Sequence, residues 1–475
     1  MITHTPRHRS PLVALAIAAV VLLLAVLPAA GEVAAGSSGE GQDGVPPRSL
    51  GRELGPFQPL AEPPSAAQPA PEEPTGPLAL RAALALALAH NPELAAFSWR
   101  VRASEARVLQ AGLRPNPEAA LTAEDIGGSR SFRGVDQAQT TLELNQLIEL
   151  GGKRAARLRA AALSRDVAAW DYEVKRLDVF TETAQAFVEV VGAQQQLELA
   201  SQAVGLGEQV VQTAATRVTA GSASPVEVTK AKVALASAEI ERSQARQRLE
   251  VARQRLAAQW GGTAPRFAAA EGALEVVHPV PPLEDLRQRL AQTPDLARWA
   301  SELAQRQATV TLEESKAVPN VTAGAGYRRL SGPDDNALVF RLSVPVPLLN
   351  RNQGAILEAR RQLAEAGEGR RAAEVGVTAA LVTAYQALAT AHDQVAALGA
   401  QVLPSAQGAF DILTAGYREG RFRYLDVLDA QRTLIAARVQ RVRALVDYHT
   451  ALAAVERLIG EPMQVEDGPD QRERD

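Results

Sequence analysis

The chain has 475 residues, a formal net charge of −4 and no cysteine. The lack of cysteine excludes disulfides, thiolate metal sites, cysteine catalysis and a lipid on an N-terminal cysteine. The near-neutral charge gives no sign of a nucleic-acid partner. Aromatic residues make up only 4% of the chain, which suits long, closely packed helices better than a large globular core.

Residues 1–35 read as an export signal, because basic residues precede an apolar run over 12–27 and small residues follow it. An uncleaved anchor is the alternative, although this run is shorter than the ~20 residues that a spanning helix needs. We expect no other membrane-spanning helix, since no later stretch is apolar over such a length. The protein would then be periplasmic, secreted or held in an outer membrane as a β-barrel.

The rest of the chain divides by composition and by repetition. Residues 36–77 are rich in Pro, Gly and Ala and predict a disordered linker. After it we predict a first repeat over 78–262, a connector over 263–282, a second repeat over 283–460 and a polar tail over 461–475.

The two repeats share landmarks in the same order, about 200 residues apart, and this indicates internal duplication. The period is too long for a solenoid, so the chain reads as two copies of one large unit. The paired landmarks are Asn91-Pro92 with Thr293-Pro294, Arg114-Pro115-Asn116 with Val318-Pro319-Asn320, Thr140–Ala155 with Phe340–Ala355, and Ala220-Gly221 with Glu419-Gly420.

Each repeat contains a helix, a β-hairpin, a very long helix, a Gly turn and a returning helix about half as long. A continuous helix over 152–219 would span about 100 Å, a length typical of coiled coils. The predicted ranges are 118–147 and 320–346 for the hairpins, 152–219 and 353–418 for the long helices, 221 and 420 for the turns, and 225–260 and 423–459 for the returning helices.

Four strands cannot close a barrel wide enough to hold a channel. A sheet in lipid must nevertheless close, because an open edge leaves backbone groups unpaired. Three chains would supply twelve strands, enough for a barrel with a lumen. The predicted fold is mainly α with a small β part. In such a trimer the long helices would form coiled coils, and each chain would contribute four strands to a membrane β-barrel.

The sequence resembles the TolC family of outer-membrane efflux channels over about 78–460. The supporting motifs are Arg-Pro-Asn-Pro at 114–117, Glu-Leu-Gly-Gly-Lys-Arg at 149–154, Pro-Val-Pro-Leu-Leu-Asn-Arg-Asn-Gln-Gly at 345–354, Ala-Gly-Tyr-Arg-Glu-Gly at 415–420 and Leu-Asp-Val-Leu-Asp-Ala-Gln at 425–431. The run at 345–354 is most similar to the branch that serves cobalt–zinc–cadmium and other heavy-metal pumps.

This resemblance implies a homotrimer in the cell outer membrane, in contact with outer-membrane lipid. A twelve-stranded barrel would cross the membrane. A twelve-helix tunnel, a long α-helical coiled-coil barrel, would cross the periplasm. The tunnel would end at the turns near 221 and 420, where it would meet a periplasmic adaptor protein and an inner-membrane pump of the resistance–nodulation–division (RND) class.

The resemblance also implies a gate at this end. Asp426 and Asp429 share a helix face, and in the family carboxylates at these positions ring the narrow periplasmic entrance, where a charged ring selects cations. Tyr417 matches a tyrosine that joins the polar links of the closed entrance. Arg421 or Arg423 is a candidate for its basic partner. The alternatives are a solvated helix face for the two acids and simple packing for the tyrosine.

Gly221 and Gly420 permit tight turns between antiparallel helices, and the adaptor contact is expected at these turns together with the two nearby arginines. Glu227 is the first-repeat counterpart of Asp426, whereas Lys230 stands where a second acid would be. The family's basic gate residue aligns with Phe422.

Outside the gate the sequence gives no catalytic, cofactor or metal residues. The histidines that follow the signal are not spaced as ligand pairs, and no nucleophile–base motif or phosphate loop appears; they are His90, His278, His392 and His449. We therefore expect a channel and not an enzyme. The rival interpretation is a periplasmic coiled-coil adaptor or scaffold, which would not need two matched hairpins. A TolC-like duct for drugs or type I secretion stays open.

Overall fold

The computed structural model describes residues 73–463. The signal predicted over 1–35, nearly all of the linker and nearly all of the tail lie outside the described residues. The described chain forms two compact units. One contains 111–158 and 310–357, and the other contains 73–110, 159–309 and 358–463. Each unit therefore takes segments from both predicted repeats.

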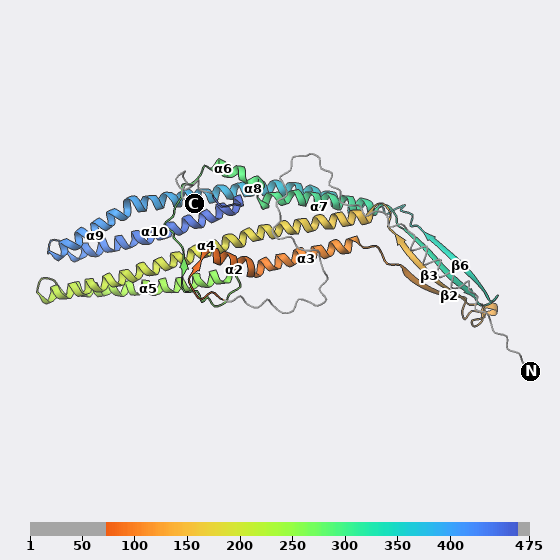
Figure 1. Cartoon of the computed structure of the whole chain (residues 1–475), viewed down its shortest axis with the longest axis horizontal. Helices are drawn as coiled ribbons and strands as arrows, with labels where there is room; N and C mark the ends of the chain where they lie inside the picture. The colour runs from red at the N-terminus through yellow and green to blue at the C-terminus, as the bar shows by residue number, and fades with distance from the viewer. Residues whose placement is uncertain (1–72, 464–475) are drawn as a thin grey trace, which may run out of the picture. The chain divides into compact units, whose positions relative to one another are not determined.

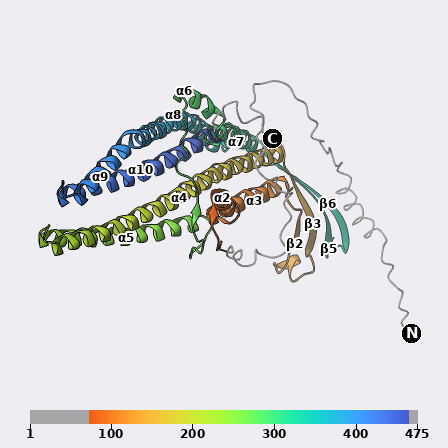
Figure 2. The ribbon, with the colours of Figure 1, turned by 60° about the vertical axis from the view of Figure 1, so that its left-hand side comes forward.

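The first unit contains a four-stranded antiparallel sheet in the order β2-β3-β5-β6, which Figure 2 shows with its strands side by side. The two hairpins join through β3 and β5, with Leu142 opposite Tyr327. Within the described chain β2 and β6 are edge strands, so the sheet is open. The strands are β2 (Glu118–Glu124), β3 (Gln139–Ile148), β5 (Val321–Leu330) and β6 (Asp335–Ser343), with a 3₁₀ turn, η1 (Arg130–Phe132), in the first hairpin loop.

The sheet has one apolar and one polar face, because side chains alternate along each strand. The pairing places Leu121, Leu142, Tyr327 and Leu338 in one row across the apolar face. Leu121 is 72% exposed in the single chain and Phe340, in the next row, is 77% exposed. A contiguous apolar face with side chains this exposed marks an interaction surface.

The polar face carries an ion pair that reaches across a whole strand. Arg341 of β6 donates to both carboxylate oxygens of Glu143 on β3, at 3.0 and 3.1 Å. The intervening β5 has Gly324 and Gly326 opposite these residues, where a Cβ would collide with the neighbouring side chains. Glycine at these positions thus makes room for the pair.

The second unit is built from helices, with α4 beside α5 and α9 beside α10 as antiparallel pairs (Figure 1). The longer elements are α4 (Lys153–Thr219), α5 (Pro225–Ala258), α8 (Gln353–Ala397), a π-helical segment, η3 (Leu398–Val402), α9 (Leu403–Arg418) and α10 (Tyr424–Ile459). The shorter ones are β1 (Leu78–Ala79), α2 (Leu80–His90), α3 (Pro92–Gly112), β4 (Ala270–Glu271), α6 (Leu283–Arg289), η2 (Leu290–Gln292) and α7 (Pro294–Lys316).

The long helix predicted over 353–418 is present in the structure, with a local irregularity past its centre. The helix widens into a π turn over Leu398–Val402, directly before Pro404. Proline lacks an N–H and its ring clashes with the carbonyl four residues earlier, and a π turn accommodates both effects without breaking the helix.

The same stretch corrects the expectation that no further helix is apolar enough to span a membrane. By length and composition alone, Gln353–Arg418 contains an 18-residue window that passes this test, and 11% of that window is buried in the single chain. Composition alone assigns no membrane span here, because Ala-rich helices that pack against other helices have the same property.

The core of the helical unit lies where both repeats meet. Trp260 and Phe267 pack edge to face with ring centroids 6.4 Å apart, in one buried cluster with Leu388, Leu445 and Tyr448. Around this core, β1 pairs with β4 in parallel, so part of the predicted irregular connector is ordered against the start of the first repeat.

The duplication is visible in the backbone as well. Three paired positions at helix boundaries have positive φ in both copies, and in one pair asparagine replaces glycine, as this region allows. The pairs are Gly152 (72°) with Asn352 (60°), Gly221 (73°) with Gly420 (78°), and Gly261 (78°) with Gly460 (75°).

Candidate functional site at the helical tip

The two helical hairpins end in tight turns at Gly221 and Gly420. Both glycines have φ above 70°, and a Cβ at either would meet nothing within 4 Å. The backbone conformation, and not a lack of space, therefore favours glycine. In the second turn the Arg421 N–H donates to the carbonyl of Gly416 at 2.7 Å, which closes the end of α9.

Tyr417 lies inside the tip. It is 5% exposed and packs in a small cluster with Ala231, Tyr424 and Val427. The rings of Tyr417 and Tyr424 are 6.2 Å apart. Since Ala231 belongs to α5 and Tyr424 to α10, this cluster joins the hairpin of the first repeat to that of the second.

Arg217, at the end of α4, is the basic neighbour of this tyrosine. Its Nη1 donates to the Tyr417 carbonyl at 2.8 Å, and its guanidinium lies over the Tyr417 ring, 4.3 Å from the centroid. The Tyr417 hydroxyl donates to Glu227 Oε2 at 3.5 Å. Burial, and to a smaller degree Glu227, raises the pKa of Tyr417, while Arg217 opposes this shift. The phenol is therefore neutral at physiological pH and acts as a donor.

The candidate partners considered from sequence have other contacts. Arg421 forms an ion pair with Glu419 beside the turn, and Arg423 uses its backbone N–H to bind Asp426. Phe422 lies over Gly416, where a Cβ would clash with the Phe422 ring. The structure therefore gives Tyr417 a cation from the opposite hairpin, which sequence reasoning missed because Arg217 belongs to no motif at the second turn.

Asp426 and Asp429 are both exposed at the start of α10 and line one groove together with Leu425 and Arg432. The Asp426 carboxylate accepts the Arg423 N–H at 3.0 Å, so it also caps the helix. A carboxylate in a first helical turn is stabilised by the helix dipole.

The first-repeat residues differ from these two acids. Glu227 is half-buried and accepts a hydrogen bond from Tyr417, whereas Lys230 is exposed. Only the second hairpin therefore presents two exposed carboxylates one turn apart.

The fold gathers three of the four histidines in residues 73–463, which are far apart in the sequence, around Tyr448. The Tyr448 hydroxyl donates to the His278 carbonyl at 3.1 Å and accepts the His278 N–H at 3.0 Å. The rings of His392 and His449 lie 6.3 and 5.1 Å from the Tyr448 ring. Over residues 73–463 no group of three His, Asp or Glu residues could hold a metal ion.

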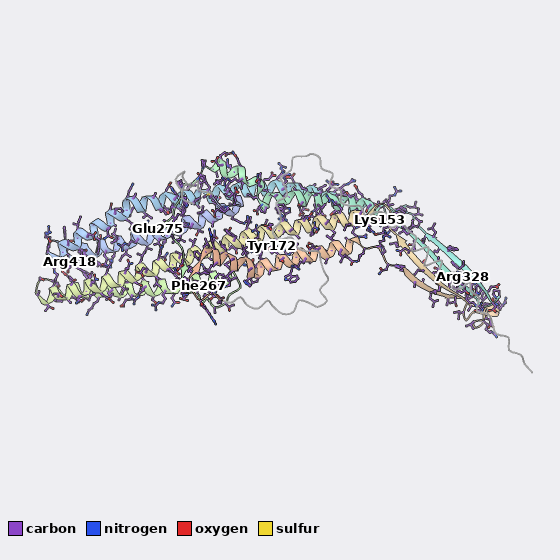
Figure 3. The ribbon with its side chains drawn as sticks, in the orientation of Figure 1. Lys153, Tyr172, Phe267, Glu275, Arg328 and Arg418 are labelled. Carbon is purple, nitrogen blue, oxygen red and sulfur yellow. The ribbon has the colours of Figure 1, made fainter. Side chains whose placement is uncertain are left out.

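The Glu-Leu-Gly-Gly-Lys-Arg motif lies in the first unit, where β3 leads into α4; Figure 3 labels its Lys153. The buried ammonium of Lys153 donates to the Asn320 side chain at 2.5 Å and to the Val318 carbonyl. Arg157 binds Glu149 through two hydrogen bonds of 2.6 and 3.1 Å and lowers the pKa of that carboxyl, against the effect of burial. The motif thus fastens the first repeat to the second below the sheet.

Comparisons with known proteins agree with this architecture. The sequence profile of the family "Outer membrane efflux protein" matches residues 83–262 and 286–461. The chain is 36% identical over 390 residues to the cobalt-zinc-cadmium resistance protein CzcC of Cupriavidus metallidurans, covering 82% of this chain and 92% of that protein. It is 30% identical over 305 residues to the nickel and cobalt resistance protein CnrC of the same organism, covering 64% and 71%.

Solved structures share the fold. The outer membrane protein VceC of Vibrio cholerae superposes with a TM-score of 0.68 at 21% identity, over 81% of this chain and 97% of that one. The open state of the MtrE outer membrane channel of Neisseria gonorrhoeae gives a TM-score of 0.68 at 18% identity, over 87% and 99%. The sequence-based resemblance to TolC-like channels is thereby confirmed. Because the profile covers most of the chain and the fold is that of these channels, the protein belongs to the outer membrane efflux protein family and is an outer-membrane channel.

Proposed function

We propose that three copies of this chain assemble into one exit duct for heavy-metal cations. We infer the cargo from the 36% identity to a cobalt-zinc-cadmium resistance protein across 92% of that protein's length. The second relative is a nickel and cobalt resistance protein, which supports divalent transition-metal cations as the class. Both relatives are resistance proteins of an efflux family, so we infer a passage and no enzymatic step.

The proposed trimer would use the open sheet as one third of a twelve-stranded barrel. β3 has 10 residues, within the 9–11 that a tilted strand needs to cross a bilayer. The exposed apolar face then meets lipid, and the Glu143–Arg341 face lines the lumen. Closure of the ring pairs β6 of one chain with β2 of the next, which removes the open edges that lipid does not tolerate.

The helical part would extend into the periplasm, with the tip as its entrance. Six carboxylates, from Asp426 and Asp429 of three chains, would attract cations there. The link between Arg217, Tyr417 and Glu227 would hold the two hairpins of each chain together in the closed entrance. A periplasmic adaptor would contact the turns at Gly221 and Gly420, together with Arg421 and Arg423, and favour the open form by binding it better. An RND pump would supply the energy.

Two measurements test the proposal. The detergent-extracted protein from the outer membrane should have the mass of a trimer, and deletion of its gene should lower cellular tolerance to cobalt, zinc or cadmium. A soluble periplasmic monomer would favour the scaffold interpretation. If the protein is a trimer but deletion of its gene leaves metal tolerance unchanged and impairs export of drugs or secreted proteins, the exit duct is supported. The proposal that its cargo is heavy-metal cations is then rejected.

A further inference from the structure

An unusually exposed apolar loop, residues 344–350, follows the last strand of the sheet and precedes α8. Its sequence is Val-Pro-Val-Pro-Leu-Leu-Asn. Val346 and Leu348 are each 73% exposed, and Leu349 is 89% exposed, the highest value for a large apolar side chain in the described chain. Apolar side chains concentrated in one short exposed segment mark an interaction surface.

The loop is held in a defined conformation by the polar residues that follow it. Pro345 and Pro347 have fixed φ and no N–H, so they end the strand ladder. Arg351 Nε donates to the Pro347 carbonyl at 3.1 Å, and the Gln353 side chain donates to the Leu349 carbonyl at 3.1 Å. Because side chains satisfy these carbonyls, the backbone is ordered while the leucines stay in solvent.

The loop continues the apolar face of the sheet. Phe340 and Leu342 belong to that face and are 77% and 73% exposed. Val344 and Val346 follow at the same two-residue spacing, beyond the last paired residue Ser343. The surface that meets lipid in the proposed function therefore extends past the end of the strands.

The first repeat has no such loop at the matching place. Ile148 is still paired with Val321 on β5, and Glu149 is bound by Arg157. Leu150, the last apolar residue there, is 40% exposed. The exposed loop is therefore a feature of the second repeat alone and not a general consequence of the strand-to-helix junction.

We propose that loop 344–350 is an interfacial anchor. It inserts Val346, Leu348 and Leu349 into the boundary between the headgroups and acyl chains of a glycerophospholipid leaflet. Such insertion reaches about 5–10 Å below the headgroups. Arg351, exposed next to the leucines, lies at the level of the lipid phosphates, as arginine side chains do at interfaces.

This inference rests on the proposed function, because it extends the lipid-facing surface of the sheet. A neighbouring copy of the chain is the competing occupant. Apolar residues alternate without a break from Phe340 to Val346, so these side chains lie on one face of the sheet. In the proposed barrel this face points outward to lipid and away from the neighbouring chains, which favours lipid as the occupant.

The lack of cysteine in the chain allows a direct depth measurement. Leu349→Cys places an environment-sensitive maleimide dye on the loop. Phe340→Cys reports the sheet face, and Val375→Cys, at a residue of α8 that is 71% exposed, is the control for apolar exposure elsewhere. The full-length protein is reconstituted in phosphatidylethanolamine–phosphatidylglycerol vesicles, with or without bromine at defined acyl positions.

We expect bromine near the headgroup end to quench the dye at 349, deeper bromine to quench the dye at 340, and neither to quench the dye at 375. Quenching at 340 without quenching at 349 would overturn the anchor and leave the proposed barrel intact. A blue-shifted dye at 349 in detergent, unaffected by brominated lipid, would mean that a neighbouring chain covers the loop, and this also overturns the anchor. Loss of quenching at both positions would reject the lipid-facing sheet itself.

Discussion

Replacement of Arg217 by glutamine should open the entrance at the tip. The change removes a charge-assisted hydrogen bond to the Tyr417 carbonyl, of a kind that contributes about 1.5–3 kcal/mol. It also removes the contact with the Tyr417 ring, about 0.5–1 kcal/mol at a solvent-accessible site. Arg217 is only half-buried, so the lower total, about 2 kcal/mol for each chain, is the appropriate figure. A shift of that size raises the ratio of open to closed hairpins about 30-fold.

The assay is single-channel conductance of the purified protein in planar bilayers. Arg217→Gln should lengthen or enlarge the open state, whereas Arg418→Gln, at an exposed residue beside Tyr417 that Figure 3 labels, should leave conductance unchanged. Tyr417→Phe removes only the 3.5 Å hydrogen bond to Glu227 and should have a much smaller effect than Arg217→Gln. If Arg217→Gln has the same conductance and the same oligomer stability as the parent protein, the contact between Arg217 and Tyr417 does not hold the entrance closed.

Three further predictions concern the entrance, the sheet and the junction below it. Asp426→Asn combined with Asp429→Asn should lower cation over anion selectivity in the same bilayers without loss of trimers; unchanged selectivity would reject the carboxylate ring. Gly326→Ala should destabilise the folded oligomer by about 1–3 kcal/mol, because its Cβ would lie 2.6 Å from a backbone carbonyl of the adjacent strand. Thermal dissociation on gels measures this, with Gly354→Ala, which has nothing within 4 Å of its Cβ, as the matched control. The lowered pKa of Glu149 means that its contribution to stability is present above the unfolded value of about 4.3 and is lost as pH falls through the lower folded value. Melting of Glu149→Gln should therefore change less between pH 6 and pH 3 than melting of the parent, and equal acid sensitivity in both proteins would contradict this account.

The main elements could be predicted because their signals are local. Alternation marks β3 and β6, and proline-free Ala-rich stretches that end at glycine mark α4 and α10. The π turn over Leu398–Val402 was not predicted, although Pro404 is visible in the sequence. A helix can accommodate an internal proline by a kink, a break or a wider turn, and the packing around the proline decides which of these forms.

The contacts at the tip were harder to predict, because they join residues about 200 positions apart whose pairing depends on how two hairpins pack. The two acids of the proposed ring could be named from the family resemblance, and their three-residue spacing places them on one helix face. The cation over Tyr417 could not, since Arg217 follows no pattern and lies on the other hairpin. The grouping of His278, His392 and His449 around Tyr448 escaped sequence analysis for the same reason.

Divergence between the two repeats places the arginine of this link on one hairpin and the tyrosine on the other. Aligned on Gly221 and Gly420, the second-repeat counterpart of Arg217 is Gly416, and the first-repeat counterpart of Tyr417 is Val218. The duplication supplies two similar helical hairpins, and the differences between them supply a specific contact that holds one against the other. The exposed loop 344–350 at the end of the sheet is likewise a feature of one repeat only, so it too arises from a difference between the two repeats.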